Sequence, residues 1–257
     1  MKIRVLGAHG AEGLAQRPSA FLVNDRILID GGTVGGALAS DEQLAIEHAL
    51  VSHSHLDHIA GLAFLTETLA LCAAQRPLTV ASLEPVVTAL RTSIFNDIVW
   101  PDFTRLPSAE APVLRFQSLK EGTEHQIGDL WVTPVAVTHT VPTAGFIVYD
   151  GGSGMIYSGD TGPTDALWTA ARGLPGLRAV ILECAFPNRL AGLAEIARHM
   201  TPELIHRELD KMPADVPVLI FHIKPQFYDE IGEELGVVSE VSGARISMLE
   251  QDKSYVF

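Results

Sequence analysis

Several short apolar runs in this chain are followed closely by a histidine or an aspartate, and this pattern constrains the fold more than any other feature of the sequence. The runs at 49–51, 130–138, 155–157 and 216–221 are each followed within about three residues by such a side chain. Short apolar runs predict buried strands, and strands mixed with helical patterns are typical of layered α/β domains. We therefore expect an α/β (α+β) protein whose functional side chains stand at the ends of strands.

The rest of the chain follows the same pattern. Further strands are expected at 3–6, 20–23, 26–29, 78–83, 145–149, 179–182, 244–248 and 254–257, and helices at 59–74, 84–93, 190–199, 202–211 and 227–235. Residues 95–112 contain three prolines and several aromatic residues, which predicts a loop or insertion. No linker or internal repeat divides the chain, so we expect one domain over 1–257, with an insertion around 95–112.

Composition excludes some classes of function. A chain of 257 residues can bury a sizeable core without disulfides, and Cys72 and Cys184 both lie in apolar segments, so we expect buried free thiols. The net charge of -13 argues against a long nucleic-acid groove, although local cations could still bind a small phosphate substrate. No apolar stretch is long enough for a bilayer, and residues 1–6 resemble a strand more than a secretory leader. We expect a cytoplasmic protein that does not bind membranes.

The densest group of polar side chains lies between an apolar strand and an apolar helix. His53, His55, Asp57 and His58 fall within six residues. A mixed set of imidazoles and carboxylates suits zinc, manganese or iron. The alternative is a polar surface loop with incidental histidines, but three clustered histidines and an aspartate rarely arise by chance.

Three separate positions could complete a two-metal site. His139, Asp160 and His222 each stand at the end of an apolar strand. Alone, each is unremarkable, because a histidine at a strand end is often structural and Gly-Asp-Thr is often a turn. In this order, after the first cluster, they are informative.

The order His-x-His-x-Asp-His, followed by separate His, Asp and His positions, resembles the metallo-β-lactamase superfamily. The resemblance implies a four-layer αββα sandwich with two divalent metal ions in a cleft at one edge, zinc being the first choice and manganese or iron the alternatives. It assigns His53, His55 and His139 to the first metal. It assigns Asp57, His58 and His222 to the second metal, and Asp160 to both as a bridge.

Additional strings resemble one subgroup, the class II cyclic nucleotide phosphodiesterases. They lie at 52–62, 94–103, 183–187, 199–202 and 222–225. This resemblance implies hydrolysis of cAMP or cGMP to the 5′-monophosphate by a metal-bound hydroxide, and a homodimer. Two metals can supply such a hydroxide at neutral pH because a bound water becomes far more acidic.

Two further residues are candidates for catalysis beside the ligand Asp57. Opening a cyclic phosphate expels a sugar alkoxide, a poor leaving group that needs a proton. His199 is free of the predicted ligand set, so we assign it as the general acid. Glu183 would fix its tautomer and raise its basicity. The alternatives are that His199 caps or packs a helix and that Glu183 is a paired surface residue.

Aromatic residues in the 95–112 segment are candidates for binding the base. Phe95, Trp100 and Phe103 could stack on it, and Asn96 could provide a polar contact. Packing of the insertion onto the body explains them equally well. Lys224 could reach the phosphate, the alternative being an ordinary solvated lysine.

Three other functions compete with a cyclic nucleotide phosphodiesterase. A tRNA 3′-processing endonuclease of the same fold shares the ligand pattern and a similar downstream Glu and His, but the strongly acidic chain, which shows no basic Gly-rich arm, disfavours it. A thioester or lactone hydrolase could use the same ligands. A non-catalytic structural metal site is disfavoured because structural sites close with fewer side chains.

Overall fold

The computed structural model describes residues 1–72, 74 and 76–257 and contains two seven-stranded sheets. The first sheet holds, in spatial order, β14 (Ser254–Val256), β1 (Lys2–Gly7), β2 (Ala20–Val23), β3 (Ile27–Ile29), β4 (His48–Leu50), β5 (Leu78–Leu83) and β6 (Leu114–Leu119). The second holds β13 (Ile246–Met248), β12 (Val218–Phe221), β11 (Leu177–Glu183), β10 (Gly154–Tyr157), β9 (Ala144–Tyr149), β8 (Leu130–Ala136) and β7 (His125–Ile127).

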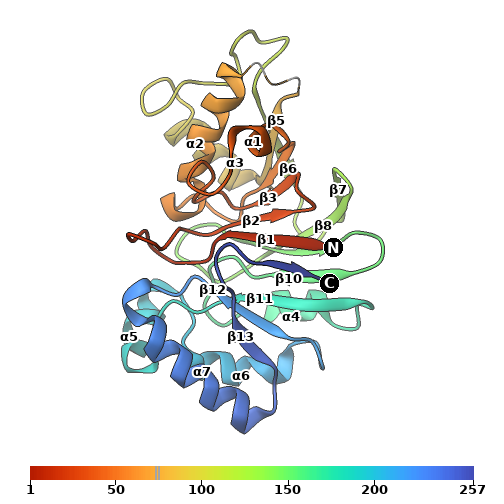
Figure 1. Ribbon diagram of the computed structural model, residues 1–257. Helices are drawn as coiled ribbons and strands as arrows, with labels where there is room; N and C mark the ends of the chain where they lie inside the picture. The colour runs from red at the N-terminus through yellow and green to blue at the C-terminus, as the bar shows by residue number, and fades with distance from the viewer. Residues whose placement is uncertain (73, 75) are drawn as a thin grey trace.

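Helices cover the outer face of each sheet, as Figure 1 shows. The first sheet is covered by α1 (Ser40–Leu44), α2 (Leu56–Leu71) and α3 (Glu84–Ser93). The second is covered by α4 (Asp165–Ala171), α5 (Ala191–Ala197), α6 (Pro202–Glu208) and α7 (Tyr228–Ser242). Short 3₁₀ turns occupy 188–190, 209–211 and 225–227. The predicted four-layer αββα sandwich is confirmed.

The alternation of side chains along the strands builds the layers. In β11, Ala179 and Ile181 face the space between the sheets, whereas Val180 and Leu182 face the helices. Both faces of this strand are therefore buried, which explains why it has an uninterrupted apolar sequence.

Parallel pairing brings several strand ends to one edge. Strands β3 to β6 run parallel to one another, and so do β10 to β13. The carboxyl ends of parallel strands meet at a common edge, where α/β proteins place their ligands. The residues that follow β3, β4, β10, β11 and β12 are therefore candidates for one shared site.

Some predicted boundaries differ from the structure. Helix α2 ends at Leu71, and residue 73 of the predicted helix 59–74 lies outside the described residues. Helix α7 runs to Ser242 and ends at Gly243, whose φ of 72° is the left-handed geometry of a helix C-cap. The segment between α3 and β6, described in full, contains turns and isolated bridges, such as the one between Phe95 and Trp100.

One expectation about cysteine is wrong. Cys184 is a buried free thiol at the end of β11, as predicted, but Cys72 is exposed. Cys72 is the C-cap residue of α2, one position past the last helical residue, so it has left the buried face of the helix. No helix among the described residues is long and apolar enough to cross a membrane.

Candidate metal centre

The loop between β4 and α2 carries four of the predicted ligands. His53 is fully buried in the loop, His55 is the N-cap residue of α2, and Asp57 and His58 lie in the first helical turn. A helix N-terminus favours a negatively charged side chain, which suits Asp57 at this position. The short chain between a strand and a helix thus holds four side chains near one point.

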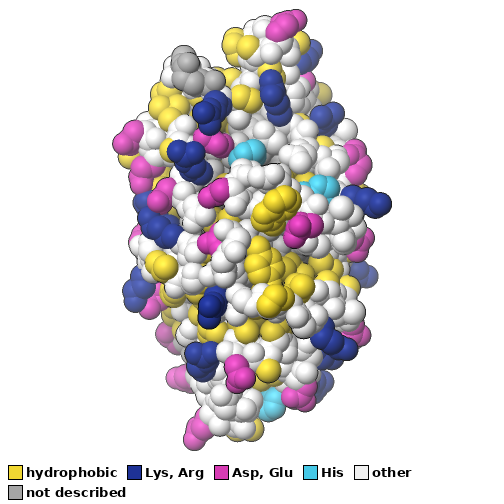
Figure 2. Space-filling model, turned by 90° about the vertical axis from the view of Figure 1, so that its right-hand side faces the viewer, with side chains coloured by type: hydrophobic (Ala, Val, Ile, Leu, Met, Phe, Trp, Pro, Cys, Tyr) yellow, Lys and Arg dark blue, Asp and Glu magenta, His cyan; other side chains and the backbone are white. Residues whose placement is uncertain are grey.

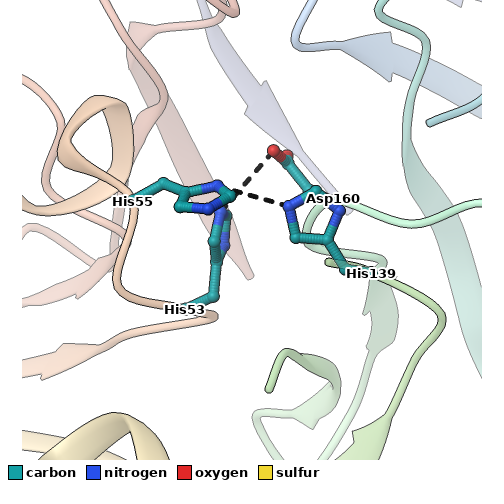
Figure 3. Close-up of side chains that lie close together, drawn as sticks. All are labelled: His53, His55, His139 and Asp160. Carbon is teal, nitrogen blue, oxygen red and sulfur yellow. Dashed lines mark hydrogen bonds and ion pairs between the residues drawn. The ribbon is translucent and has the colours of Figure 1, made fainter. Parts of the chain in front are cut away.

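One group of ligand atoms joins this loop to the second sheet (Figure 3). Atoms of His53, His55, His139 and Asp160 all lie within 4.8 Å of one another. His139 Nε2 is 3.3 Å from His55 Nδ1, and His53 Nε2 is 3.6 Å from Asp160 Oδ2. The structure brings together the three residues predicted for the first metal, with Asp160 beside them.

A second group lies on the other side of Asp160. Ligand atoms of Asp57, His58 and His222 are within 4.8 Å of one another. Asp160 Oδ1 is 3.2 Å from His58 Nε2, and Asp160 Oδ2 is 3.1 Å from His222 Nε2. Asp160 therefore touches both groups, the position that a bridging ligand requires.

The donor atoms fit divalent metal ions. Among the described residues, His53 Nε2, His58 Nε2 and Asp160 Oδ1 are buried without a hydrogen-bond partner. Buried polar atoms are normally paired, so imidazole nitrogens and a carboxylate oxygen that face one another without such a partner fit a divalent cation as their shared ligand. The residues present can thus hold two metal ions.

Protonation favours metal binding as well. Burial lowers the pKa of His139 to about 4 and holds the pKa of His53 and of His222 well below the usual value. These imidazoles are neutral at pH 7, the form that binds metals. Burial raises the pKa of Asp160, but His222 and His58 outweigh it and hold that pKa well below the usual range.

His58 shows most directly where positive charge is favourable. Burial lowers its pKa, but Asp160 and Asp30 on either side outweigh burial and raise the pKa well above 6.5. The two carboxylates therefore stabilise positive charge on this imidazole. A divalent ion bound at Nε2 would supply positive charge at the same place.

Asp30 supports the site, although it is not among the residues predicted from the sequence. Its carboxylate accepts hydrogen bonds from the Ser52 backbone N–H at 2.7 Å, from the Ser52 hydroxyl at 2.8 Å and from the Tyr157 hydroxyl at 2.6 Å. It also lies 2.7 Å from His58 Nδ1, which leaves Nε2 to face the site. The available signal was its position directly after the strand at 27–29, the same pattern that identified the ligands.

Strained backbone holds two residues of the centre. Asp30 has φ 54° and His222 has φ 64°, a left-handed conformation that is costly for residues with a side chain. The His222 N–H donates to the Ala8 carbonyl at 2.7 Å, and a Cβ on Gly10 would lie 2.9 Å from His222 Nε2. The loop after β1 must therefore carry glycine where it passes the imidazole.

The predicted pair of Glu183 and His199 is present beside the ligands. His199 Nδ1 is 2.7 Å from Glu183 Oε1, and both residues are buried. The His199 ring stacks on His222 at 5.4 Å between centroids, and its ligand atom lies within 4.8 Å of Asp160 and His222. Burial lowers the pKa of His199, but the Glu183 carboxylate outweighs it and raises that pKa.

Comparison with known proteins identifies the family. The family described as β-lactamase superfamily domain matches residues 25–223, well over half of the chain. The chain belongs to the metallo-β-lactamase superfamily. Its site is a buried His/Asp centre consistent with a binuclear metal site, and the protein is a hydrolase of this fold.

Relatives in the superfamily include a cyclic-nucleotide phosphodiesterase and a ribonuclease. Over 245 residues, the chain is 28% identical to a probable 3′,5′-cyclic-nucleotide phosphodiesterase from Yersinia pestis, covering 83% of this chain and 68% of the relative. It is 25% identical over 287 residues to ribonuclease Z from Methanosarcina mazei, covering 90% of each. The fold superimposes on unliganded yeast PDE1 with a TM-score of 0.86, at 19% identity and over 100% and 99% of the two chains.

The predicted base-binding residues pack within the first half of the molecule. Phe95 and Phe103 are only 3% and 6% exposed, and both belong to the apolar core beneath α2 and α3. Trp100 is half-buried and packs edge-on against Phe64 at 5.3 Å between ring centroids. Asn96 Oδ1 accepts from the backbone N–H groups of residues 98 and 99, which closes a local turn. These contacts favour the packing interpretation.

Lys224 lies close to the centre. Its ammonium donates to the Gly10 carbonyl at 2.9 Å and stands 5.7 Å from the centre of the Phe186 ring. Its positive charge also acts to lower the pKa of His199 and of His222. An ammonium has three donors, so one bond to Gly10 leaves capacity for a phosphate oxygen.

Proposed function

We propose that this protein is a metal-dependent phosphodiesterase that hydrolyses 3′,5′-cyclic nucleotides, cAMP or cGMP, to 5′-monophosphates. The observation that carries the phosphodiester cleavage is the Glu183–His199 pair, which stands beside Asp160 and His222, and the choice of a cyclic substrate rests on the acidic chain and the Yersinia pestis relative. A proton donor next to a metal centre suits a substrate whose leaving group is an alkoxide. A substrate with a better leaving group would not need this pair.

The His and Asp ligands would hold the metal ions that act on the phosphate. Two divalent ions, with zinc as the first choice, would supply an acidified water and positive charge for the phosphate oxygens. Asp57 has a side chain that is 29% exposed, whereas the Asp160 side chain is 2% exposed. Asp57 can therefore also accept a hydrogen bond from the attacking water, and Lys224 can donate to a phosphate oxygen.

His199 delivers the proton to the leaving oxygen. Its Nδ1 is held by Glu183, so Nε2 is the nitrogen that exchanges a proton with the substrate. The P–O3′ bond breaks as the 3′ oxygen takes this proton, and the water oxygen remains on the phosphorus. The product is a 5′-monophosphate with a free 3′ hydroxyl.

A processing endonuclease for tRNA remains the second candidate, because the likeness to ribonuclease Z covers 90% of both chains. A long RNA requires clustered cations, whereas this chain carries a net charge of -13. On the face drawn in Figure 2, Lys and Arg are interspersed with Asp and Glu and form no continuous stripe. The acidic chain and the Yersinia pestis relative favour the small substrate.

One assay separates these functions. Metal-loaded protein is incubated with cAMP, cGMP, a tRNA precursor and a thioester, and the products are separated by chromatography. We expect 5′-monophosphate from a cyclic nucleotide and no tRNA cleavage. Cleavage of the precursor with no turnover of either cyclic nucleotide would transfer the assignment to the second candidate.

A further inference from the structure

Two cavities of similar size border the metal centre, one at Asp57 and the other at His199. The first cavity, about 590 Å³, lies between the 32–36 loop and the start of α2, and Asp57 is in its wall. The second cavity, about 550 Å³, lies between α5, α6 and the loops that carry Thr138 and Gly162, and His199 is in its wall. Each is large enough for a small-molecule ligand.

The two cavities differ in charge. The charged residues lining the first cavity are Glu12 and Asp57, and no Lys or Arg is among its described lining residues. The second is lined by Arg198 and Arg207 against the single carboxylate of Glu195. Arg207 is also paired with Glu203 at 3.0 Å, so the charges around the second cavity balance, whereas the charged residues lining the first cavity are both carboxylates. In a chain with a net charge of -13, the second cavity is therefore the less negative of the two and suits the neutral nucleoside part of a substrate.

The chemistry of the leaving group selects between the cavities. In a cyclic nucleotide, the 3′ oxygen that leaves belongs to the same ribose that carries the base. Because His199 would protonate that oxygen, the ribose must lie on the His199 side of the centre. The base, attached to that ribose, then extends along the cavity that His199 lines.

We propose that the second cavity is the nucleoside subsite of the enzyme, an inference that rests on the proposed function. Leu204 and Ala194 provide an apolar wall for the base, and Thr138, which also lines the cavity, offers a hydroxyl to the ribose. Arg198 donates one N–H to the His139 carbonyl at 2.6 Å and has four further N–H groups. The first cavity, in which both charged lining residues are carboxylates, does not hold the nucleoside.

A matched pair of glycine substitutions tests this assignment. Gly192 in α5 lines the second cavity, and a Cβ there would meet no atom within 4 Å. Gly35 lines the first cavity, and a Cβ there would meet only Gln43 at 3.8 Å. Neither has a positive φ, so Gly192→Phe and Gly35→Phe each add a ring at the wall of one cavity without backbone strain.

The two variants should behave differently. We expect Gly192→Phe to raise KM for cyclic nucleotides roughly ten- to hundredfold, because the new ring occupies the space of the base. Calorimetry should show weaker binding of the 5′-monophosphate but unchanged binding of inorganic phosphate. Methyl p-nitrophenyl phosphate, which has no nucleoside, should be affected far less. Gly35→Phe should match the wild type in all these measurements.

A second variant guards against a folding defect in the first. Arg207 is exposed on α6, so Arg207→Glu should fold, and the thermal midpoint and metal content would verify both variants. It should weaken binding of the 5′-monophosphate severalfold at low salt and less at high salt.

The outcomes distinguish the inference from the proposed function. If the wild type neither turns over nor binds cyclic nucleotides, both fail together. Two results would overturn the subsite alone, in a wild type that does turn over cyclic nucleotides. Either Gly35→Phe, and not Gly192→Phe, would raise KM and weaken nucleotide binding, or Gly192→Phe and Arg207→Glu would both bind nucleotides like the wild type.

Discussion

The two halves of the sandwich build the metal centre in different ways. The first half supplies His53, His55, Asp57 and His58 from one loop, so their spacing is fixed by a single strand-to-helix connection. The second half supplies isolated residues after β8, β10 and β12, whose spacing exists only once the strands have paired. The centre is therefore local on one side and dependent on the whole sheet on the other.

The largest effect should come from Asp160, the residue of the second half that touches both ligand groups. Asp160→Ala is expected to lose both metals and to reduce turnover to background, because the bridge belongs to both sites. Elemental analysis of loaded protein measures this, and Asp165→Ala, an exposed aspartate of α4, is the control. A variant that retains two metals would show that the halves are joined in another way.

His199→Ala should have the next largest effect. We expect metal content to stay unchanged and cyclic nucleotide turnover to fall about 10²–10⁴-fold, since the alkoxide loses its proton donor. A nitrophenyl phosphodiester needs no proton on its leaving group and should lose much less. His206→Ala, in the neighbouring helix α6, serves as the matched control. Loss of a metal in His199→Ala would make His199 a ligand instead of the acid.

Asp30 tests the local support in the first half. Asp30→Asn replaces an acceptor that serves Ser52, Tyr157 and His58 with an amide that is also a donor. We expect metal affinity to fall roughly 10–100-fold, as for other residues that orient a ligand. Competition with a chelator measures it, with Asp25→Asn, an exposed aspartate of similar φ, as control. Unchanged affinity would contradict the role of Asp30 in orienting His58.

The smallest effect on catalysis should come from Phe103. Because it is buried in the core, Phe103→Ala should destabilise the fold by about 3–5 kcal/mol and leave KM for cyclic nucleotides nearly unchanged. Denaturant unfolding gives the first quantity and steady-state kinetics the second. Phe64→Ala, at a 57% exposed position, should cost much less stability. A raised KM with normal stability would restore the base-binding interpretation.

This comparison also explains what could be predicted from sequence. The apolar strands and the ligands at their ends could be predicted because burial and metal binding each restrict which types of residue can occur at a position. A sequence does not show which residues contact one another, so the role of Asp30 could not be predicted, although Asp30 directly follows a predicted strand. Phe95 and Phe103 were ambiguous for the same reason: an aromatic residue has the same signal in a core as in a binding site. The helix predicted over 227–235 continues as α7 to Ser242, because tertiary packing that buries Val238 overrides the low helix propensity of Gly236.

The most direct test of the central claim is a metal titration of depleted protein, with 5′-monophosphate formation from a cyclic nucleotide followed at each step. The account predicts two metals bound per chain and turnover that reaches its plateau only near the second equivalent. A plateau at one equivalent, turnover without metal, or a 3′-monophosphate product would contradict a two-metal centre that both halves build and that expels the 3′ oxygen.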